Sequence, residues 1–243
     1  MKTIKIKAVI HDLDSTIYGT LDGALAHWQK LLFRAGIPFG RSERSLMIKS
    51  WGKSGTEIFQ DALGISAEEA ERVALLGGPG DMDASRPLIR GAREALAFNC
   101  RHDIANLLLT SRPRNEAIHI LESHGILKYF RFVYANDDAP YIKPDPRVFE
   151  KPLACLRRFG ITRRQCVYVG DTFFDFAAGQ GAGVRTVMVL TGPYKYAVHR
   201  AHFDGFMVND ADVISSVKYM PLWFERNNVR FPKIDKKFAP LLL

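Results

Sequence analysis

The sequence predicts an α/β protein, in which a Rossmann-like core with a parallel sheet carries an inserted all-helical domain. Two observations lead to this prediction. From residue 86 onward, short apolar runs alternate with amphipathic segments, which is typical of βαβ units. Between the first strand and residue 86, the pattern is helical throughout. We therefore expect a core of residues 1–16 and 86–217, a helical cap of residues 17–85, and a basic, aromatic C-terminal extension of residues 218–243.

The composition is that of a folded, water-soluble protein. Of the 243 residues, 47% are hydrophobic and 25% are charged, and 19 glycines and 12 prolines are ordinary numbers. No internal repeat or heptad pattern is present, which excludes fibrous and solenoid folds. No run approaches the roughly 20 apolar residues that cross a bilayer, so we expect no membrane partner.

The first half of the chain begins with a strand. Apolar residues alternate and then become continuous over Ile4–Ile10, as in a strand that enters a core. They then recur every three or four residues over Leu21–Leu32, which predicts a helix that ends near Gly36. Ser66, followed three residues later by Glu69, has the pattern of a capping box. Three further helices are predicted over Ser42–Lys49, Gly55–Leu63 and Ser66–Leu76.

The second half of the chain alternates between helices and strands. Clusters of glycine and proline at 77–80 and 86–87 separate it from the first half. The predicted helices cover Gly91–Phe98, Asn115–His124, Arg147–Phe159 and Phe174–Ala182. The predicted strands cover Ile104–Leu109, Phe130–Tyr134, Cys166–Val169 and Thr186–Leu190.

The first strand ends at two carboxylates, Asp12 and Asp14. In an open parallel sheet, ligands bind beyond the carboxyl ends of the strands. Two neighbouring carboxylates repel each other unless a cation lies between them, and Mg²⁺ prefers such oxygen ligands. An Asp-x-Asp pair is also common in ordinary turns, so this pair gains meaning only from its neighbours in the sheet.

Two further strand ends supply a hydroxyl and a lysine. Thr110 and Ser111 follow the second strand, where a hydroxyl can hydrogen-bond a phosphoryl oxygen or simply cap the next helix. After the third strand comes the segment Lys143-Pro144-Asp145, in which Asp145 is predicted to cap the next helix. A lysine on so stiff a loop is suited to neutralising an anionic nucleophile and a phosphoryl group; the alternative is a surface lysine.

The fourth strand runs into Asp171, and Asp175 follows one helical turn later. Both carboxylates can face the cation of the first strand. Asp175 alternatively serves only to complement the dipole of its helix. Four carboxylates, a hydroxyl and a lysine after four different strands form a combination far more specific than any one of them.

These motifs, Asp12-x-Asp14-x-Thr16, Thr110, Lys143-Pro144 and Gly170-Asp171-x-x-x-Asp175, resemble those of the haloacid dehalogenase superfamily of phosphohydrolases. The resemblance covers about residues 4–217. The helical insertion between the first two motifs is similar to the C1 cap of the phosphoglycolate phosphatase and β-phosphoglucomutase branch. Ser15 stands where the family usually has glycine, and His11 stands where it usually has an apolar or aromatic residue.

The resemblance implies a Mg²⁺-dependent phosphatase that acts on a small phosphate monoester. It implies that Asp12 is the nucleophile, that Asp14 is first the acid and then the base, and that Thr110 and Lys143 hold phosphoryl oxygens. The implied Mg²⁺ ligands are the Asp12 and Asp171 carboxylates and the Asp14 backbone carbonyl, with Asp175 at or next to the metal. A β-phosphoglucomutase-like phosphomutase, a pyrimidine 5′-nucleotidase and a non-catalytic phosphate-binding domain remain alternatives.

Substrate contacts outside the four motifs are expected from Ser111 and Lys53. Lys53 lies in the segment Trp51–Thr56, at the place where C1-cap members carry a loop that lowers over the substrate. An ordinary turn between helices is an equally good interpretation of this segment.

Charge and cysteine usage limit the remaining partners. The net charge of +8 is spread along the chain, so a nucleic-acid partner is not expected. The extension of residues 218–243 is expected to pack its aromatic residues on the core, and a homodimer surface is the alternative. Three cysteines without a Cys-x-x-Cys pair predict reduced and mostly buried thiols, and no signal-peptide pattern is visible, so we expect a cytoplasmic location.

Overall fold

The computed structural model describes residues 5–51, 53, 55–77, 86–193, 202–203, 206–207 and 212–229. The chain divides into two compact units. Met1–Tyr18 and Leu88–Leu243 form one, here named the sheet unit, and Gly19–Pro87 form the other, the helical unit. The first and last parts of the chain therefore fold together, because Ala8 of the first strand pairs with Ala105 and with Cys166, 97 and 158 residues later.

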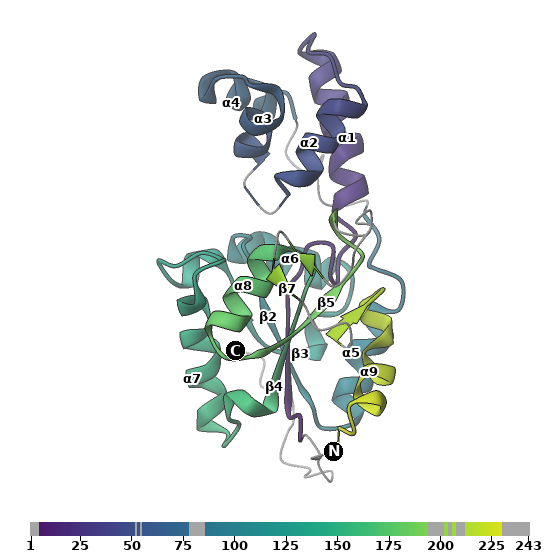
Figure 1. Cartoon of the computed structure of the whole chain (residues 1–243), viewed down its shortest axis with the longest axis vertical. Helices are drawn as coiled ribbons and strands as arrows, with labels where there is room; N and C mark the ends of the chain where they lie inside the picture. Colours follow the sequence, from purple (N-terminus) through teal and green to yellow (C-terminus); the bar gives the residue numbers. More distant parts are fainter. Residues whose placement is uncertain are drawn as a thin grey trace. The chain divides into compact units, whose positions relative to one another are not determined.

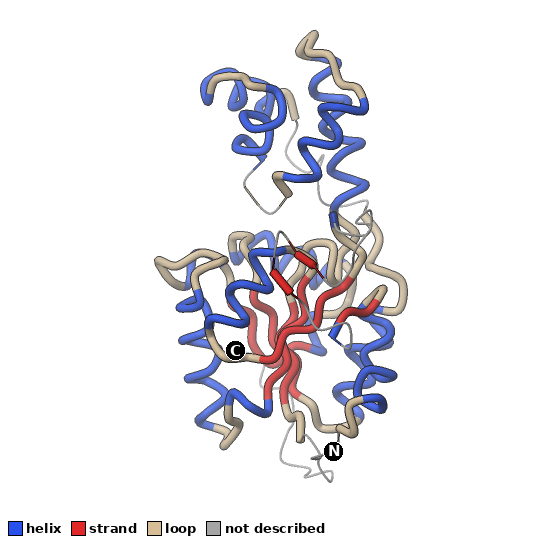
Figure 2. The backbone as a smooth tube through the Cα atoms, in the orientation of Figure 1, coloured by secondary structure: helices blue, strands red, loops and turns tan. Residues whose placement is uncertain are grey.

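A six-stranded parallel sheet forms the centre of the sheet unit, and it confirms the predicted α/β class (Figure 2). The strand order is β3-β2-β1-β4-β5-β8, and each neighbouring pair is parallel. The strands are β1 (Ala8–His11), β2 (Ala105–Leu109), β3 (Phe130–Tyr134), β4 (Cys166–Gly170), β5 (Arg185–Val189) and β8 (Val213–Ile214). A separate antiparallel pair joins β6 (His202–Phe203) and β7 (Phe206–Met207).

Helices cover both faces of the sheet (Figure 1). On one face lie α5 (Ala92–Arg101), α6 (Arg114–Ser123) and α9 (Met220–Arg226), and on the other lie α7 (Glu150–Arg158) and α8 (Phe173–Gly181). The side chains of β1 alternate between the two hydrophobic clusters, with Val9 in the first and Ile10 in the second. Because both faces are covered, β1 is buried at every position.

Four helices make up the described part of the helical unit: α1 (Leu21–Arg34), α2 (Arg41–Lys49), α3 (Gly55–Leu63) and α4 (Ala67–Leu75). They enclose their own hydrophobic cluster, in which the ring of Trp28 lies 5.6 Å from the rings of both Trp51 and Phe59. The Ser66 hydroxyl accepts a hydrogen bond from the Glu69 N–H (3.1 Å), which is the first half of the predicted capping box.

The described residues after 217 are part of the sheet unit. Trp223 and Phe224 of α9 are buried in the same cluster as Val9. The Trp223 indole N–H donates to Asp212 Oδ1 (3.0 Å), and the Arg185 guanidinium both pairs with Asp212 and lies over the Trp223 ring. Residues 218–229 therefore contribute to the core. The basic and aromatic residues at 230–243, for which a homodimer surface was the alternative, lie outside the described residues.

Local predictions fail mainly at the ends of elements. The first strand begins at Ala8 because the ladder with β2 and β4 begins there. The single helix expected over Arg147–Phe159 is a 3-10 turn, Pro146–Phe149, followed by α7. Asp145 caps that turn, since its Oδ1 accepts from the Arg147 N–H (2.9 Å). The short β8, the β6–β7 pair and α9 were not predicted, because elements of two to seven residues carry little periodicity.

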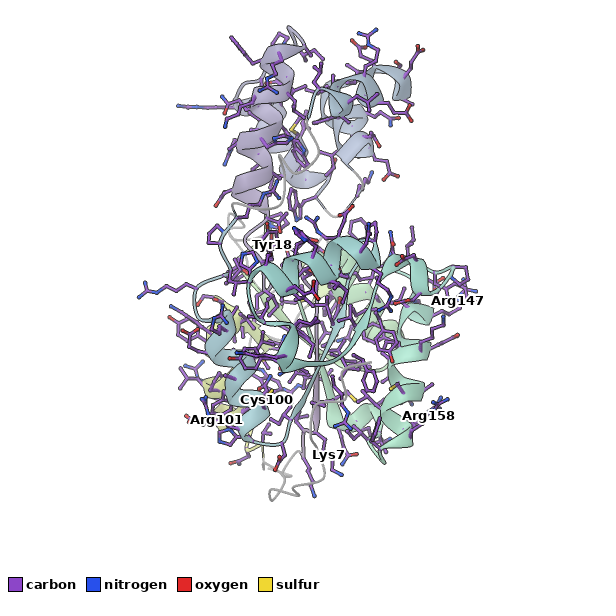
Figure 3. All side chains as sticks on the ribbon, turned by 180° about the vertical axis from the view of Figure 1, so that it is seen from behind. Lys7, Tyr18, Cys100, Arg101, Arg147 and Arg158 are labelled. Atoms are coloured by element: carbon purple, nitrogen blue, oxygen red, sulfur yellow. The ribbon has the colours of Figure 1, made fainter. Side chains whose placement is uncertain are left out.

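The surface and the cysteines bear on the expected partners. None of the described helices is long and apolar enough to cross a membrane. In the sheet unit, Arg101 lies on one side and Arg147 and Arg158 on the other, so these cations form no common patch (Figure 3).

All three cysteines are free, but only Cys166 is buried. The expectation of mostly buried thiols is therefore wrong, because Cys100 is exposed and the third thiol is partly exposed.

Candidate active site

The sheet register brings the predicted motif residues to one edge. Strand β1 lies between β2 and β4, and His11 pairs with Leu108 and Val169. The Asp12 N–H continues this ladder by donating to the Val169 carbonyl (2.8 Å). Asp12 therefore leaves the sheet beside the residues that follow β2 and β4, which are Thr110 and Asp171.

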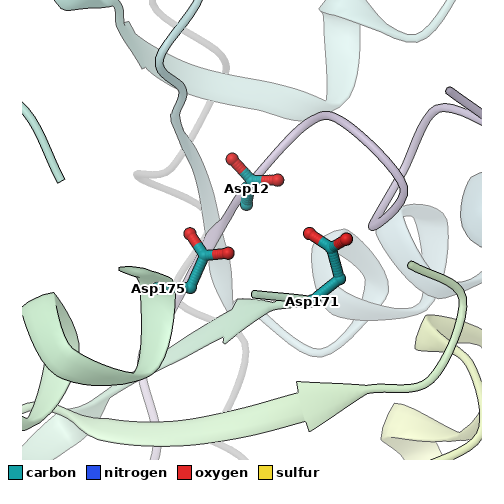
Figure 4. A group of neighbouring side chains, drawn as sticks. All are labelled: Asp12, Asp171 and Asp175. Atoms are coloured by element: carbon teal, nitrogen blue, oxygen red, sulfur yellow. The ribbon is translucent and has the colours of Figure 1, made fainter. Parts of the chain in front are cut away.

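Three carboxylates meet at this edge: Asp12, Asp171 and Asp175 (Figure 4). Each offers an oxygen atom, and these atoms lie within 4.8 Å of one another. All three side chains are buried. Such a group resists close approach unless positive charge lies among the oxygens.

Lys143 supplies one positive charge to the group. Its Nζ lies 2.6 Å from Asp12 Oδ1 and 2.6 Å from Asp175 Oδ1, and its side chain is 8% exposed. Three carboxylates and one ammonium leave two negative charges unbalanced when all groups are ionised. The surplus matches the charge of one divalent cation.

Asp175 is fully engaged by donors from this chain. Its Oδ1 accepts from Lys143 and from the Tyr168 hydroxyl (2.5 Å), and its Oδ2 accepts from the Thr172 N–H (3.0 Å) and hydroxyl (2.6 Å). Burial alone would raise the pKa of Asp175, but the Lys143 charge and these hydrogen bonds together lower it. The reciprocal bonds with Thr172 also form the capping box of α8. Asp175 is thus placed to fix Lys143, and its oxygens are saturated.

Asp171 is the opposite case. Both of its carboxylate oxygens are buried, and neither has a hydrogen-bond partner among the described residues. Burial, together with the charges of Asp175 and Asp12, raises the pKa of Asp171 well above its usual value. A Cβ atom on Gly192 would lie 1.7 Å from Asp171 Oδ2, so glycine leaves the room that this carboxylate occupies. Native proteins rarely bury a carboxylate without partners, and a hard cation would supply the missing contact. The donor set therefore fits Mg²⁺, with Asp171 as the best-prepared ligand.

Asp12 lies between these two environments. Burial raises the pKa of Asp12 to about 7, and the neighbouring carboxylates act in the same direction, while the Lys143 ammonium opposes them. An added cation at Asp171 would favour the ionised form of Asp12 further. Asp12 is therefore a carboxylate whose charge depends on the cations beside it.

The Asp14 carboxylate points to a different partner, Arg112, which lies 98 residues away in sequence. The guanidinium donates from Nε to both carboxylate oxygens (3.0 and 2.8 Å) and from Nη2 to Oδ1 (2.8 Å). The remaining donor, Nη1, bonds Glu116 Oε2 (3.1 Å). The Asp14 side chain is thus held by Arg112 and is not a member of the buried group of three carboxylates.

The predicted substrate-binding residues have varied positions. Thr110 is buried, and its hydroxyl accepts from the Arg112 N–H (3.2 Å). Ser111 is exposed and, with Thr110 and Lys143, lines a pocket at the ends of β2 and β3. Lys53 belongs to the helical unit, where its Nζ pairs with Asp61 Oδ2 (2.6 Å).

The two departures from the family pattern have local explanations. Ser15 has φ +57°, a conformation that favours glycine, and its N–H donates to the Tyr18 carbonyl (2.7 Å). His11 is buried, and its Nε2 lies 3.0 Å from Asn106 Oδ1. That oxygen also accepts from the Asn99 amide (2.7 Å). Because the Asn106 amide nitrogen is already used as a donor, Nε2 of His11 must carry the proton.

Sequence reasoning assigned no role to four residues that shape the site: Arg112, Tyr168, Thr172 and Gly192. Thr172 with Asp175 has capping-box spacing, with aspartate in the place of glutamate, which is a signal available in the sequence. Arg112 follows a strand end closely, but nothing local indicates that its partner is Asp14.

Comparison with known proteins agrees with this geometry. The sequence model of the haloacid dehalogenase-like hydrolases matches residues 9–189, which is more than half of the chain. The chain belongs to the haloacid dehalogenase-like hydrolase family. It is therefore an enzyme of a hydrolase family, and the family predicted from the four motifs is confirmed.

Curated relatives belong to the predicted phosphoglycolate phosphatase branch. Phosphoglycolate phosphatase 1 of Pseudomonas aeruginosa is 24% identical over 196 residues, which cover 76% of this chain and 70% of the relative. Phosphoglycolate phosphatase of Photorhabdus laumondii is 23% identical, with 87% and 92% covered. Among solved structures, a haloacid dehalogenase-like hydrolase of Bacteroides fragilis has a TM-score of 0.72 at 20% identity, covering 89% of this chain and all of that one. A subfamily IA hydrolase of Geobacter sulfurreducens has a TM-score of 0.65 at 23% identity, covering 89% and 95%.

Proposed function

We propose that this protein is a Mg²⁺-dependent phosphatase that hydrolyses a small phosphate monoester through an aspartyl-phosphate on Asp12. The observation that carries the proposal is the group of three buried carboxylates with a single ammonium. One of these carboxylates, Asp171, has no partner from the described residues for either oxygen. This arrangement is suited to a divalent cation and a phosphoryl group bound together.

Each residue has a task that its contacts support. Asp12 attacks phosphorus, and Lys143, 2.6 Å from its Oδ1, neutralises the charge that an incoming phosphoryl group adds. Asp175 and Tyr168 hold the Lys143 ammonium in place. Thr110 offers its hydroxyl to a phosphoryl oxygen, and that hydroxyl is fixed by the Arg112 N–H.

The metal ligands in this proposal are the Asp12 and Asp171 carboxylates and the Asp14 backbone carbonyl. When bound, Mg²⁺ supplies charge neutralisation and orients the phosphoryl oxygens. Asp175, with its oxygens saturated by donors of this chain, acts next to the metal rather than on it. Asp14 serves as the acid toward the departing alcohol and as the base toward the water that hydrolyses the intermediate.

The helical unit is proposed to be the C1-type cap, and Ser111 and Lys53 are proposed to contact the organic part of the substrate. The relatives named above are phosphoglycolate phosphatases, which supports a small, polar substrate. A cytoplasmic location is proposed from the sequence, in which three cysteines form no Cys-x-x-Cys pair.

Phosphate release from a panel of phosphate monoesters tests the proposal. Wild type, Asp12→Asn and Arg114→Gln are compared with Mg²⁺ and with EDTA. Arg114 pairs with Asp138 and, in the described part of the chain, with none of the three carboxylates, so its variant is the control at a charged residue outside that group. We expect Mg²⁺-dependent turnover by wild type and by Arg114→Gln, and none by Asp12→Asn.

The same panel separates the alternatives. Isomerisation of a sugar phosphate without phosphate release would identify a phosphomutase. Activity confined to pyrimidine nucleoside monophosphates would identify a nucleotidase. A folded wild type that turns over no ester with Mg²⁺ would refute the proposed function and favour a phosphate-binding domain.

A further inference from the structure

The ion pair between Arg112 and Asp14 lies at the mouth of the site. The side chains of Arg112 and Asp14 are 13% and 25% exposed, whereas those of Asp12 and Asp175 are 7% and 1% exposed. Glu116, which holds the third donor of the guanidinium, is 43% exposed. The pair therefore lies on the solvent side of the buried carboxylates, where the organic part of a substrate would lie.

This pair is incompatible with the role of Asp14 as the acid that protonates the departing alcohol. Both oxygens of the Asp14 carboxylate accept hydrogen bonds from the guanidinium, at 2.8 to 3.0 Å. In that arrangement they are directed to Arg112 and not to the ester oxygen of a substrate. Asp14 can act on the ester oxygen only after the guanidinium has moved or turned away.

A guanidinium exchanges one carboxylate for another at the lowest cost, because a second carboxylate restores the same bidentate geometry and the same charge balance. We propose that Arg112 recognises a carboxylate on the alcohol part of the substrate and, by turning to it, releases Asp14 to the ester oxygen. This inference rests on the proposed function. The substrate class is a phosphate monoester whose alcohol carries a carboxylate a few bonds from the ester oxygen. The separation must be short because Arg112 contacts Asp14 directly, and Asp14 is the residue that acts on the ester oxygen.

The surrounding contacts support Arg112 in this role. Lys143 is committed to Asp12 and Asp175. Arg114 donates to the Val133 carbonyl and pairs with Asp138. Arg112 is anchored at both ends, by its N–H on the Thr110 hydroxyl and by Nη1 on Glu116. Its Nε and Nη2 can therefore change partner while the guanidinium stays at the site.

The test compares two esters that differ mainly in the carboxylate, 2-phosphoglycolate and 2-hydroxyethyl phosphate. For each enzyme we measure kcat/KM on both and take their ratio. We expect wild type to prefer the carboxylate ester about 10- to 100-fold, the range given by hydrogen bonds to a charged group. Arg112→Gln should reduce the ratio to about one, and Arg114→Gln should keep the wild-type ratio.

A third substrate separates recognition from general damage. p-Nitrophenyl phosphate has no carboxylate, and its leaving group departs without a proton. Arg112→Gln should retain most of its activity on this ester, whereas a merely structural role would lower all three activities together. Arg112→Lys, which keeps the charge and loses the fork of donors, should give an intermediate ratio and serves as the second variant if Arg112→Gln does not fold.

The outcomes that overturn the inference are distinct from failure of the proposed function. An unchanged ratio in both Arg112 variants, an equal loss of the ratio in Arg114→Gln, or a wild type without preference for the carboxylate ester would each overturn the role of Arg112. In those cases Mg²⁺-dependent hydrolysis of p-nitrophenyl phosphate by wild type would leave the proposed function standing. If folded wild type with Mg²⁺ hydrolyses none of the three esters, both fail.

Discussion

Replacement of Asp171 by asparagine should make the metal-free protein more stable while removing its response to Mg²⁺. Both oxygens of Asp171 are buried without a partner among the described residues, and the cost of such a group is about 1–3 kcal/mol. Asparagine keeps the shape and removes the charge, but leaves an amide that is also poorly bonded. We therefore expect Asp171→Asn to raise the free energy of unfolding in EDTA by about 1–2 kcal/mol. For a chain of this size each kcal/mol shifts Tm by about 2–4 °C.

The gain should depend on pH with a definite sign. The pKa of Asp171 is raised well above its usual 3.8 by burial and by neighbouring carboxylates. The unfolded chain therefore loses this proton first, and the carboxyl group destabilises the fold increasingly as pH rises from 3.8 toward the folded pKa. The advantage of Asp171→Asn over wild type should thus be larger at pH 8.5 than at pH 5.

Mg²⁺ should reverse the ranking of the two proteins. A ligand at 100 times its Kd stabilises the folded state by about 2.7 kcal/mol, so wild type gains several degrees and Asp171→Asn gains little. Thermal unfolding in EDTA and across a Mg²⁺ titration measures both effects. Asp138→Asn is the matched control, because Asp138 pairs with Arg114 and its variant should keep the Mg²⁺ shift. The reasoning is refuted if Asp171→Asn is less stable than wild type in EDTA and shows the same Mg²⁺ shift.

Three further predictions concern buried groups. Burial lowers the pKa of His11 from 6.5 to about 4, so the unfolded chain binds a proton at this imidazole before the folded chain does. The free energy of unfolding should therefore fall by about 3 kcal/mol in total as pH drops from 6.5 to 4. Urea unfolding should show that His11→Gln lacks this loss, and equal pH profiles for the two proteins would contradict the prediction. Burial raises the pKa of Cys166 to about 12, so iodoacetamide at pH 8 should modify this thiol only after unfolding. Mass spectrometry reads the modification, and a modified Cys166 in the native protein would count against the prediction. Gly192→Ala places a methyl group where Asp171 Oδ2 lies, so calorimetry should find weaker Mg²⁺ binding; wild-type affinity would show that the carboxylate has other room.

Much of the fold follows from local pattern. The alternation of apolar runs and amphipathic segments after residue 86 predicts a parallel sheet, and the strands from Ala105–Leu109 to Arg185–Val189 lie within one residue of their predicted positions. Parallel topology then places every strand's carboxyl end at one edge. For this reason Asp12, Lys143 and Asp171 could be assigned to one site before their contacts were visible.

Local pattern does not extend to partners that only folding brings together. Arg112 and Asp14 are 98 residues apart, and no periodicity links them. The same holds for β8, a strand of two residues that exists because the edge of β5 offers it a partner. The buried position of Trp223 depends on two distant partners: its indole N–H donates a hydrogen bond to Asp212, and the Arg185 guanidinium lies over its ring.

The sequence by itself determined the α/β class and the chemical groups of the site, because residue type and strand-end position are local properties. Only the tertiary structure decided how those groups share charge. It saturated Asp175, left Asp171 without a donor from the described part of the chain, and paired Asp14 with Arg112. Burial and hydrogen bonding set these differences among four aspartates of identical chemistry, and both depend on the whole fold.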